Sequence, residues 1–404
     1  MNKPALPFGL PDPVAGSPDL LVVAGEHSGD EHAARMVREL RAAHPGLKVC
    51  ALGGPELAAA GAQLLHDLTA TSVVGFVEVL KHYSFFKALF DATLRWIERH
   101  RPRAVCFVDY PGFNLRLAAQ LRERGLSAKG GGKTKLLYYI SPQIWAWKPK
   151  RRFTMARDLD ALAVIFPFEP ACYQDTDLPV EFVGHPFLDG DYAPPVRHDR
   201  AGPVLLLPGS RVQAVSRIFP VLLRGFEEHR RLLPEARATV LHPSDEVRAA
   251  LDRTLTGFPQ LAGAITLTRT DKGGGDKSPS GGRAPPLPAS AVLTSSGTMS
   301  LHCALAGIPG AIAYRTNFLT YLLARWWVKL DYIGIGNLLL KEPMYPEFIQ
   351  GAAAPAALAA QLRECVGDPA RAGRTRAQAA RLRELLHHPA GTTAAGWVAG
   401  RLAG

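Results

Sequence analysis

The chain has few features of a secreted, membrane-spanning or metal-binding protein. Its 5 cysteines include no Cys-x-x-Cys pair, and an odd number without a framework spacing predicts a reducing compartment. No apolar run reaches the length of a membrane-spanning helix, and the Pro-rich beginning lacks the continuous apolar region of a signal peptide. The 13 histidines show no HExxH-like spacing, so no metal site is expected. These absences together predict a cytoplasmic protein.

What the chain does have is an excess of positive charge. Its 404 residues include 47 Lys and Arg against 36 Asp and Glu, a net charge of +11. This excess favours an anionic partner, which could be nucleic acid, a phosphorylated metabolite or an anionic membrane face. No nucleic-acid-binding module is visible, so nucleic acid is the least favoured of the three.

Apolar runs alternate with amphipathic helical patterns such as residues 31–43, which predicts parallel sheets covered by helices. The pattern restarts near residue 203, so we expect an α/β protein with two doubly wound, Rossmann-like domains. The expected boundaries are an N-terminal domain at 1–187, a C-terminal domain at 188–365, and a helical segment at 366–404 that packs back on the N-terminal domain. The expected strands are 20–24, 49–52, 104–108, 136–140, 161–166, 181–183, 204–207, 238–241, 264–268, 291–294 and 311–314.

Four segments stand apart from this alternation. Residues 129–135 (KGGGKTK) and 272–288 are rich in Gly, and the second also in Pro and Ser, so both are expected to be disordered surface loops. Residues 83–100 and 317–330 combine aromatic and basic side chains in amphipathic patterns. Such patterns suit a membrane interface, although core packing explains them as well.

The first strand ends in a turn that crowds polar side chains. The apolar run stops at Gly25, and Glu26, Ser28, Gly29 and Asp30 follow within five residues. In an open α/β sheet, ligands bind outside the carboxyl ends of the strands, so this turn could line a substrate site. The alternative is an ordinary strand-to-helix turn in which Ser28 or Asp30 caps the helix.

Asp109 follows another apolar strand in the same domain. A carboxylate at the carboxyl end of a strand is a candidate general base. Asn114 can cap the next helix, so Asp109 is not needed for that role. The alternative is an Asp that bonds to amides of its own turn.

Two turns in the second half suit a phosphate group. Residues 208–211 (PGSR) and 295–298 (SSGT) each follow a strand and open a helix, whose N-terminus presents free N–H groups. Arg211 adds a cation suited to phosphate oxygens. The two turns could converge on one diphosphate through Arg211, Ser295, Ser296, Gly297 and Thr298, or each could simply be a helix cap.

Residues 138–152 mix aromatic side chains with cations. Nucleic-acid binding can have this composition, and so can binding of a phosphorylated, membrane-embedded substrate. Core tryptophans beside a solvated basic turn are the third interpretation.

Taken together, these motifs resemble those of the lipid-A-disaccharide synthase family. They occur in the family's order across most of the chain, and it is their combination that is specific. The matching residues are 24–30 (AGEHSGD), 53–55 (GGP), 72–75 (SVVG), Asp109 with Pro111, Phe113 and Asn114, 141–147 (SPQIWAW), 166–169 (FPFE), 183–186 (VGHP), 207–211 (LPGSR), 296–298 (SGT), 314–315 (YR), 337–338 (NL) and 346–350 (PEFIQ).

The resemblance implies a GT-B glycosyltransferase whose two domains face a cleft. Such an enzyme joins UDP-2,3-diacylglucosamine to 2,3-diacylglucosamine 1-phosphate, with inversion and without a metal or cofactor, at the inner face of the cytoplasmic membrane. The donor belongs to the C-terminal domain and the acceptor to the N-terminal one. Asp109 matches the family's proposed base. The remaining residues matched to substrate binding are Glu26, Ser28, Gly29, Asp30, Asn114, Ser141, Trp145, Arg211, Ser295, Ser296, Gly297, Thr298, Asn337 and Gln350.

One position departs from the family pattern. Where the family has Glu after the Ser-Gly-Thr turn, this chain has His302. A neutral His accepts one hydrogen bond, whereas a carboxylate can hold both ribose hydroxyls. A non-catalytic relative that binds lipid precursors is therefore one alternative. A UDP-N-acetylglucosamine 2-epimerase on the same fold is another, which the membrane-like aromatic stretches disfavour.

Overall fold

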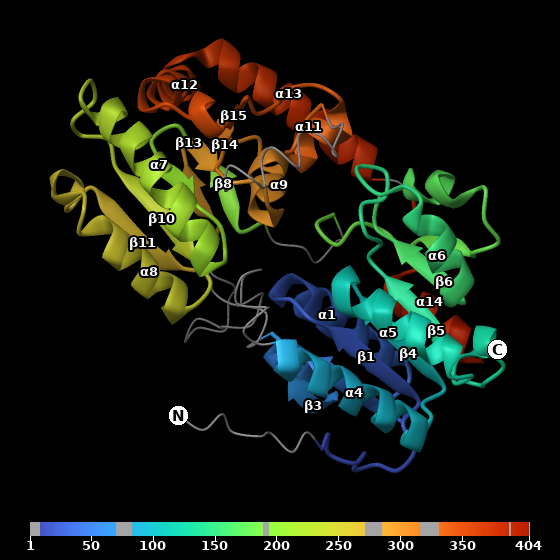
Figure 1. Ribbon diagram of the computed structural model, residues 1–404. Helices are drawn as coiled ribbons and strands as arrows, with labels where there is room; N and C mark the ends of the chain where they lie inside the picture. The colour runs from blue at the N-terminus through green and yellow to red at the C-terminus, as the bar shows by residue number, and fades with distance from the viewer. Residues whose placement is uncertain are drawn as a thin grey trace, which may run out of the picture. The chain divides into compact units, whose positions relative to one another are not determined.

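The computed structural model describes residues 9–69, 83–188, 194–270, 285–315, 331–387 and 389–403. They form two compact units, Met1–Pro186 with His388–Gly404, and Phe187–His387. Each unit contains a parallel β-sheet with helices on both faces (Figure 1). The amphipathic stretch 317–330, the motif at 72–75 and most of the Gly-rich segment 272–288 lie outside the described residues.

The first unit contains a seven-stranded parallel sheet in the order β3-β2-β1-β4-β5-β6-β7. Its central strands are continuous apolar runs, which suits strands that are buried on both faces. The strand order reverses between β1 and β4, and this switch point is where ligands bind in such sheets. The strands are β1 (Leu20–Ala24), β2 (Val49–Gly53), β3 (Gln63–Asp67), β4 (Ala104–Val108), β5 (Lys135–Tyr139), β6 (Ala161–Val164) and β7 (Val180–Phe182).

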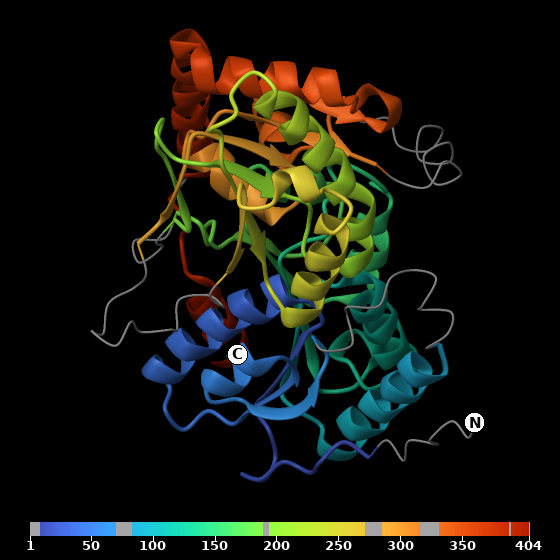
Figure 2. The ribbon, with the colours of Figure 1, turned by 90° about the vertical axis from the view of Figure 1, so that its left-hand side faces the viewer.

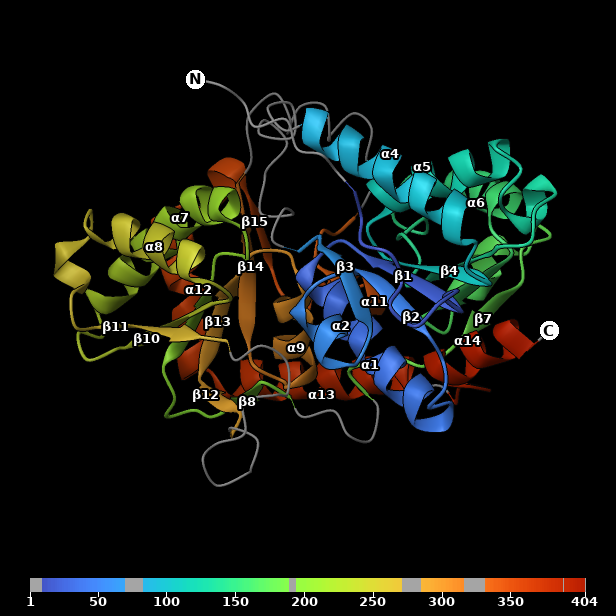
Figure 3. The same ribbon diagram turned by 90° about the horizontal axis from the view of Figure 1, so that it is seen from below.

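Alternate residues of this sheet face two separate layers of helices. Leu21 and Val23 of β1 join the core under α4, α5 and α6, whereas Leu20 and Val22 join the core under α1, α2 and α14. Figure 3 shows these two groups of helices on opposite faces of the sheet. The helices are α1 (His27–Ala43), α2 (Pro55–Ala59), α4 (Tyr83–His100), α5 (Pro111–Glu123), α6 (Arg151–Asp158) and α14 (Ala394–Ala403).

The C-terminal segment differs from the expectation of one helical piece at 366–404. Helix α13 (Pro369–Leu386) packs on three helices of the second unit, α9 (Thr298–Leu305), α11 (Ile335–Leu340) and α12 (Pro355–Gly367). Only α14 packs on the first unit, where Trp397, Val398 and Leu402 lie in the core beside α1. Figure 2 shows this red helix beside the blue helix α1. The expectation fails for α13 because its buried face packs against helices of the second unit.

The second unit contains a six-stranded parallel sheet in the order β11-β10-β9-β13-β14-β15, again with a switch point between its two central strands. A separate two-stranded parallel sheet pairs β8 with β12. The strands are β8 (Val196–His198), β9 (Val204–Leu207), β10 (Ala238–His242), β11 (Ile265–Arg269), β12 (Leu287–Ala289), β13 (Ala291–Thr294), β14 (Gly310–Tyr314) and β15 (Glu347–Ile349).

Helices cover both faces of this second sheet. Val204 and Leu206 of β9 join one core with α7, α8 and α12. Helices α9, α11 and α13 contact one another, and Figure 3 shows α9 and α13 on the other side of β13 and β14. Besides α9 (Thr298–Leu305) and α13, the helices are α7 (Val212–Arg230), α8 (Asp245–Leu255), α11 (Ile335–Leu340) and α12 (Pro355–Gly367).

The Gly-rich segment at 129–135 is ordered, contrary to the sequence-based expectation. A 3₁₀ turn spans Ala128–Gly130. Backbone amides of Gly130 and Gly132 both donate to the carbonyl of Ser127, at 2.9 and 2.8 Å. Glycine fits here because a Cβ on Gly132 would lie 2.2 Å from the carbonyl oxygen of Leu126. The glycines therefore allow a tight turn that leads into β5.

Among the described residues, no helix is both long and apolar enough to cross a membrane.

Candidate active site

The turns after β1 and β4 abut at the switch point of the first unit. These strands pair in parallel with Ala24 opposite Val108. A Cβ on Gly25 would lie 2.2 Å from the ring of Tyr110, so the absence of a side chain there lets the ring close over the β1 turn. Gly29 similarly brings α1 close to the carbonyl of Val108. The turns that carry Glu26 and Asp109 are thus adjacent.

The backbone of Asp109 is held by three hydrogen bonds. Its N–H donates to the carbonyl of Tyr139 at 3.0 Å. Its carbonyl accepts from the Tyr138 hydroxyl at 2.6 Å and from the Asn114 side-chain amide at 2.7 Å. Asp109 and Tyr110 both have left-handed φ angles, 47° and 49°, which are uncommon for residues with a side chain. Such strained positions persist where the surroundings over-determine them, and they cluster at active sites.

This arrangement fixes the backbone of Asp109, and with it the start of its side chain, at the carboxyl edge of the sheet. Burial is the main cause that raises the pKa of Tyr138 well above its usual value. Its hydroxyl therefore stays protonated and can donate the hydrogen bond to the Asp109 carbonyl. A carboxylate that is half-exposed and held on a rigid turn is suited to accept a proton from a hydroxyl. Tyr138 and Tyr110 were not identified from the sequence, because their roles depend on contacts between separate strands.

Glu26 and Ser28 lie at the start of α1, on the same edge as Asp109. The helix begins at His27, four residues earlier than expected, and Glu26 is its N-cap without a side-chain cap hydrogen bond. Ser28 and Asp30 lie within the helix, so the alternative in which one of them caps it is wrong. Glu26 and Ser28 are half-buried, whereas Gly29 is buried against β4.

The side chain of Asp30 is directed into the protein, where it binds the start of helix α2. Its Oδ1 accepts from the amides of Gly54 at 2.7 Å and Leu57 at 3.3 Å, and its Oδ2 accepts from the amide of Glu56 at 3.0 Å. The residue is 1% exposed, and burial, the main cause, raises its pKa. Asp30 therefore caps a helix, but that helix starts 25 residues later in the chain.

Replacing Asp30 with Ala should lower the free energy of unfolding by about 2–4 kcal/mol, because two buried N–H groups and one part-buried N–H group lose their acceptor. Asp30→Asn should cost less, since its Oδ1 can still accept from Gly54 and Leu57. Denaturant unfolding measures both. Asp252→Ala, which removes an exposed ion pair with Arg248, is a matched control with an expected cost below about 0.5 kcal/mol. Unchanged stability in Asp30→Ala would contradict the capping role.

The side chains of Asn114 and Ser141 also form hydrogen bonds inside the protein. Asn114 is fully buried, and besides Asp109 its amide donates to the carbonyls of Val23 at 3.3 Å and Val108 at 3.4 Å. It therefore ties the ends of β1 and β4 together, and the prediction that it caps α5 was wrong. Ser141 is 6% exposed, and its Oγ lies 2.6 Å from the Tyr173 hydroxyl and 2.9 Å from the Pro142 carbonyl.

Trp145 lies in an aromatic cluster above a buried acid. Its ring packs edge-on against Phe166 and Phe168, with centroids 5.9 and 5.3 Å away. Glu169 is 1% exposed, and its Oε2 accepts from the Phe166 amide at 3.0 Å. Burial raises the pKa of Glu169 to about 8, although the Phe166 amide and the Trp145 indole oppose the rise. The sequence motif contained Glu169, but its burial was not predictable from local pattern.

Glu169 should make stability depend on pH. The native carboxyl keeps its proton to about pH 8, whereas the unfolded one loses it near its usual value of 4.5, so the native state binds more protons between these values. The free energy of unfolding therefore falls as pH rises through this window, by about 3 kcal/mol between pH 5 and 8. Glu169→Gln should lack that fall. Unfolding curves of both proteins at several pH values measure the difference, and equal slopes would contradict the prediction.

In the second unit, the two turns proposed to bind phosphate lie side by side. Strands β9 and β13 pair in parallel with Thr294 opposite Leu207, and the amide of Ser295 donates to the Leu207 carbonyl at 2.9 Å. Gly209 has a left-handed φ of 118°, and a Cβ on it would lie 3.6 Å from the Ser295 hydroxyl. The residues therefore converge at the switch point, as the sequence allowed.

Each of these turns leads directly into a helix. Arg211 is the exposed N-cap of α7, and Gly297 is the N-cap of α9. Neither cap residue forms a side-chain cap hydrogen bond. Thr298 is exposed and Ser296 is half-buried at the same edge, so an anion there would meet hydroxyls, backbone N–H groups and a guanidinium together.

Asn337 is 1% exposed, and its side chain forms hydrogen bonds to a neighbouring loop. Its amide donates to the Tyr345 carbonyl at 2.6 Å and to Glu347 Oε1 at 2.8 Å, and its Oδ1 accepts from the Tyr345 amide at 2.8 Å. Glu347 also accepts from the amides of Ile333 and Gly334. This network supports the start of β15, and the role of Glu347 was not recognised in the sequence. Gln350 follows the carboxyl end of β15 with a left-handed φ of 55°.

His302 lies on the second turn of α9. Its ring packs on Phe187, with centroids 3.9 Å apart and an interplanar angle of 30°. The position at which the resemblance implies a carboxylate thus carries an aromatic contact in this chain. Within the described part of the chain, no group of three His, Cys, Asp or Glu side chains is arranged to hold a metal ion.

Two Rossmann-like units, each with polar turns gathered at its switch point, give the chain the GT-B fold. It matches the family described as Lipid-A-disaccharide synthetase over residues 20–398, and it belongs to that family. Lipid-A-disaccharide synthase 1 of Legionella pneumophila (strain Philadelphia 1) is 34% identical over 385 residues, covering 91% of this chain and 93% of that protein. Lipid-A-disaccharide synthase of Geobacter sulfurreducens is 34% identical over 377 residues, covering 91% and 92%. The chain is therefore a glycosyltransferase of lipid A biosynthesis.

Solved structures support the fold. A protein from Listeria monocytogenes described as a UDP-N-acetylglucosamine 2-epimerase aligns with a TM-score of 0.56 at 10% identity, covering 96% of this chain and 95% of that one. The glycotransferase of kitacinnamycin aligns with a TM-score of 0.53 at 15% identity, covering 95% and 99%. At these identities the likeness concerns the fold alone.

Proposed function

We propose that the protein transfers 2,3-diacylglucosamine from UDP-2,3-diacylglucosamine to 2,3-diacylglucosamine 1-phosphate, with inversion at the anomeric carbon. The products are a β-1,6-linked disaccharide 1-phosphate and UDP. The observation that carries this proposal is Asp109, whose backbone carbonyl accepts hydrogen bonds from Tyr138 and Asn114 at the switch point of the first unit. Membership of the lipid-A-disaccharide synthase family supports the substrates.

In the proposed step, Asp109 accepts the proton of the acceptor's 6-hydroxyl as that oxygen attacks the anomeric carbon of the donor. The bond from this carbon to the diphosphate oxygen breaks, and UDP leaves with the electron pair. One base is sufficient for inversion, because the leaving diphosphate needs charge stabilisation more than a proton. Arg211 and the N-terminal turns of α7 and α9 supply that stabilisation with fixed charges and dipoles.

The donor is assigned to the second unit and the acceptor to the first. In the second unit, Ser295, Ser296, Gly297 and Thr298 would contact the diphosphate together with Arg211. In the first unit, Glu26 and Ser28 lie beside the Asp109 turn, where they could contact the acceptor sugar. Asp30, Asn114 and Asn337 act indirectly in this scheme, because their side chains support the turns that carry the contact residues.

The protein is proposed to work in the cytoplasm at the inner face of the cytoplasmic membrane. Trp147 is 42% exposed with Lys148 and Arg151 against its ring, at 4.6 and 5.4 Å from the ring centroid. Phe153 is 48% exposed nearby in the chain. Exposed aromatic side chains with cations suit contact with an anionic lipid surface.

The test is release of UDP from the acylated donor by the purified protein, with and without the acylated acceptor. We expect release only when both substrates are present, with the disaccharide detected by mass spectrometry. Release from a non-acylated UDP-sugar without acceptor would instead indicate an epimerase. Normal UDP binding without any turnover would indicate a non-catalytic relative.

A further inference from the structure

A basic cavity in the second unit is unrelated to the turns at its switch point. The cavity has a volume of about 370 Å³ and lies between the β8 strand with its following turn and helix α13. It is lined by Arg197, His198, Asp199, Arg200, Pro369, Ala372 and Arg376. Its three arginines and one acid give the lining of the cavity an excess of positive charge.

The single acid of the cavity is already neutralised. Asp199 forms an ion pair with Arg197 at 2.9 Å and accepts from the amide of Ala201 at 3.1 Å. The Ala201 amide and Arg197 both lower the pKa of Asp199, so it is ionised. Within the described part of the chain, Arg200 and Arg376 have no hydrogen-bond or ion-pair partner. Two positive charges therefore remain at the cavity without a counter-charge.

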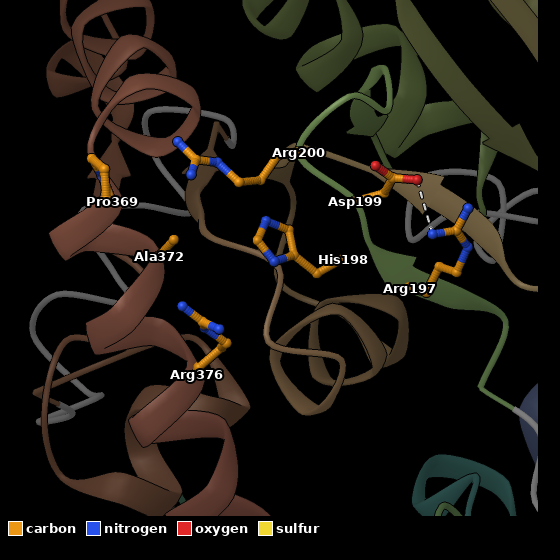
Figure 4. A pocket seen from close by; sticks show the side chains of 7 residues that line it. All are labelled: Arg197, His198, Asp199, Arg200, Pro369, Ala372 and Arg376. Atoms are coloured by element: carbon orange, nitrogen blue, oxygen red, sulfur yellow. Dashed lines mark ion pairs between the residues drawn. The ribbon is translucent and has the colours of Figure 1, made fainter.

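These two arginines converge on His198. Figure 4 shows Arg200 and Arg376 on either side of His198, beside Ala372, while the Arg197–Asp199 pair points the other way. Burial lowers the pKa of His198, and both guanidiniums lower it further, so they lie close enough to repel a charge on the ring. An anion bound between the two guanidinium groups would reduce the repulsion between their positive charges.

The cavity lies at the opposite end of the strands from Arg211 and residues 295–298. Residues 197–200 precede β9, and the Asp199 amide donates to the Ala289 carbonyl at 2.9 Å, just before β13 begins. The phosphate turns follow the carboxyl ends of the same two strands. A four-residue strand spans about 13 Å, so one phosphate group cannot contact both places. The N-terminus of α13 is also occupied, because Asp368 accepts from the amides of Ala370 and Arg371.

We propose that this cavity is a second anion site, which binds a phosphate group between Arg200 and Arg376. Guanidinium groups match phosphate oxygens in pairs, and two of them facing a small hollow fit a phosphate monoester or diphosphate better than a carboxylate. The phosphate could belong to a soluble molecule or to a lipid headgroup, because both present the same oxygens. The proposal does not depend on the proposed function, since no residue of the reaction lines the cavity.

The test compares the wild-type protein with Arg200→Gln/Arg376→Gln in calorimetric titrations with inorganic phosphate and pyrophosphate at constant ionic strength. Both side chains are exposed, so the double variant should fold, which thermal unfolding verifies. We expect binding at least tenfold weaker in the double variant and unchanged in Arg253→Gln, a matched control at an exposed arginine of α8. Sedimentation with vesicles of phosphatidylglycerol or phosphatidylcholine forms a second arm.

The possible results separate the two phosphate sources and the two places on the second unit. Binding of free phosphate that depends on Arg200 and Arg376 supports a soluble ligand. Binding to phosphatidylglycerol vesicles alone, with the same dependence, supports a headgroup. Phosphate binding that is lost in Arg211→Ala but kept in the double variant would belong to the switch-point turns and would overturn the proposal, as would no difference between the double variant and the wild type.

Discussion

Replacing Asp109 with Asn is expected to lower kcat by about 10³-fold or more, because the amide cannot accept the proton of the attacking hydroxyl. The substitution should leave the fold intact. The bonds from Tyr138 and Asn114 go to the backbone carbonyl of Asp109 and do not involve its carboxylate. Acceptor-dependent UDP release, followed together with thermal unfolding, measures both effects.

Tyr138→Phe provides the comparison for this prediction. It keeps the ring in the core but removes the 2.6 Å hydrogen bond that holds the Asp109 carbonyl. We expect a smaller loss of kcat, because the base remains but its direction is less well fixed. An Asp109→Asn protein with activity near that of the wild type would remove Asp109 from the proposed mechanism.

Replacing Arg211 with Ala is expected to lower kcat/KM by about 10²–10³-fold. The guanidinium would face the charge that develops on the leaving diphosphate, and loss of one such fixed group typically has this effect. Arg211→Lys should lie in between, because an ammonium keeps the charge without the paired N–H groups. Steady-state kinetics measure the loss, and calorimetry with UDP tests whether binding weakens in parallel.

The matched control for Arg211 is Arg253→Ala, at an exposed arginine of α8 distant in sequence from both turns. It should leave kcat/KM and UDP affinity unchanged. If UDP bound to Arg211→Ala as tightly as to the wild type, the diphosphate would have to be placed elsewhere in the second unit.

Much of the fold could be predicted because buried parallel strands are continuous apolar runs. The runs at Leu20–Ala24, Ala104–Val108 and Ala291–Thr294 match β1, β4 and β13 residue for residue. The strands β3, β8, β12 and β15 were missed, and residues 287 and 288 of β12 were expected in a disordered loop. The strands β3 and β15 are edge strands whose residues are mostly half-exposed, and β8 and β12 have only three residues each, so these sequences carry no such run.

The candidate sites were predictable in position but less so in the direction of the side chains. Turns at the carboxyl ends of strands are expected to gather at a switch point, and this placed Asp109 and Arg211 correctly at sheet edges. Asp30 and Asn114 lie in the first turns of the helices that follow β1 and β4, yet both point inward. Their partners, such as Gly54 for Asp30 and Val23 for Asn114, are distant in sequence, so no local pattern reveals them.

Helix α14 has a consequence for how the chain acquires its structure during synthesis. The core of the first unit includes Trp397 and Leu402, which are synthesised after the second unit. The part of this core that α14 covers therefore stays exposed while the second unit is being made, until α14 docks on α1. Nascent first units would expose apolar surface throughout this interval, which makes them clients for chaperones and makes α14 a sensitive place for truncation or fusion.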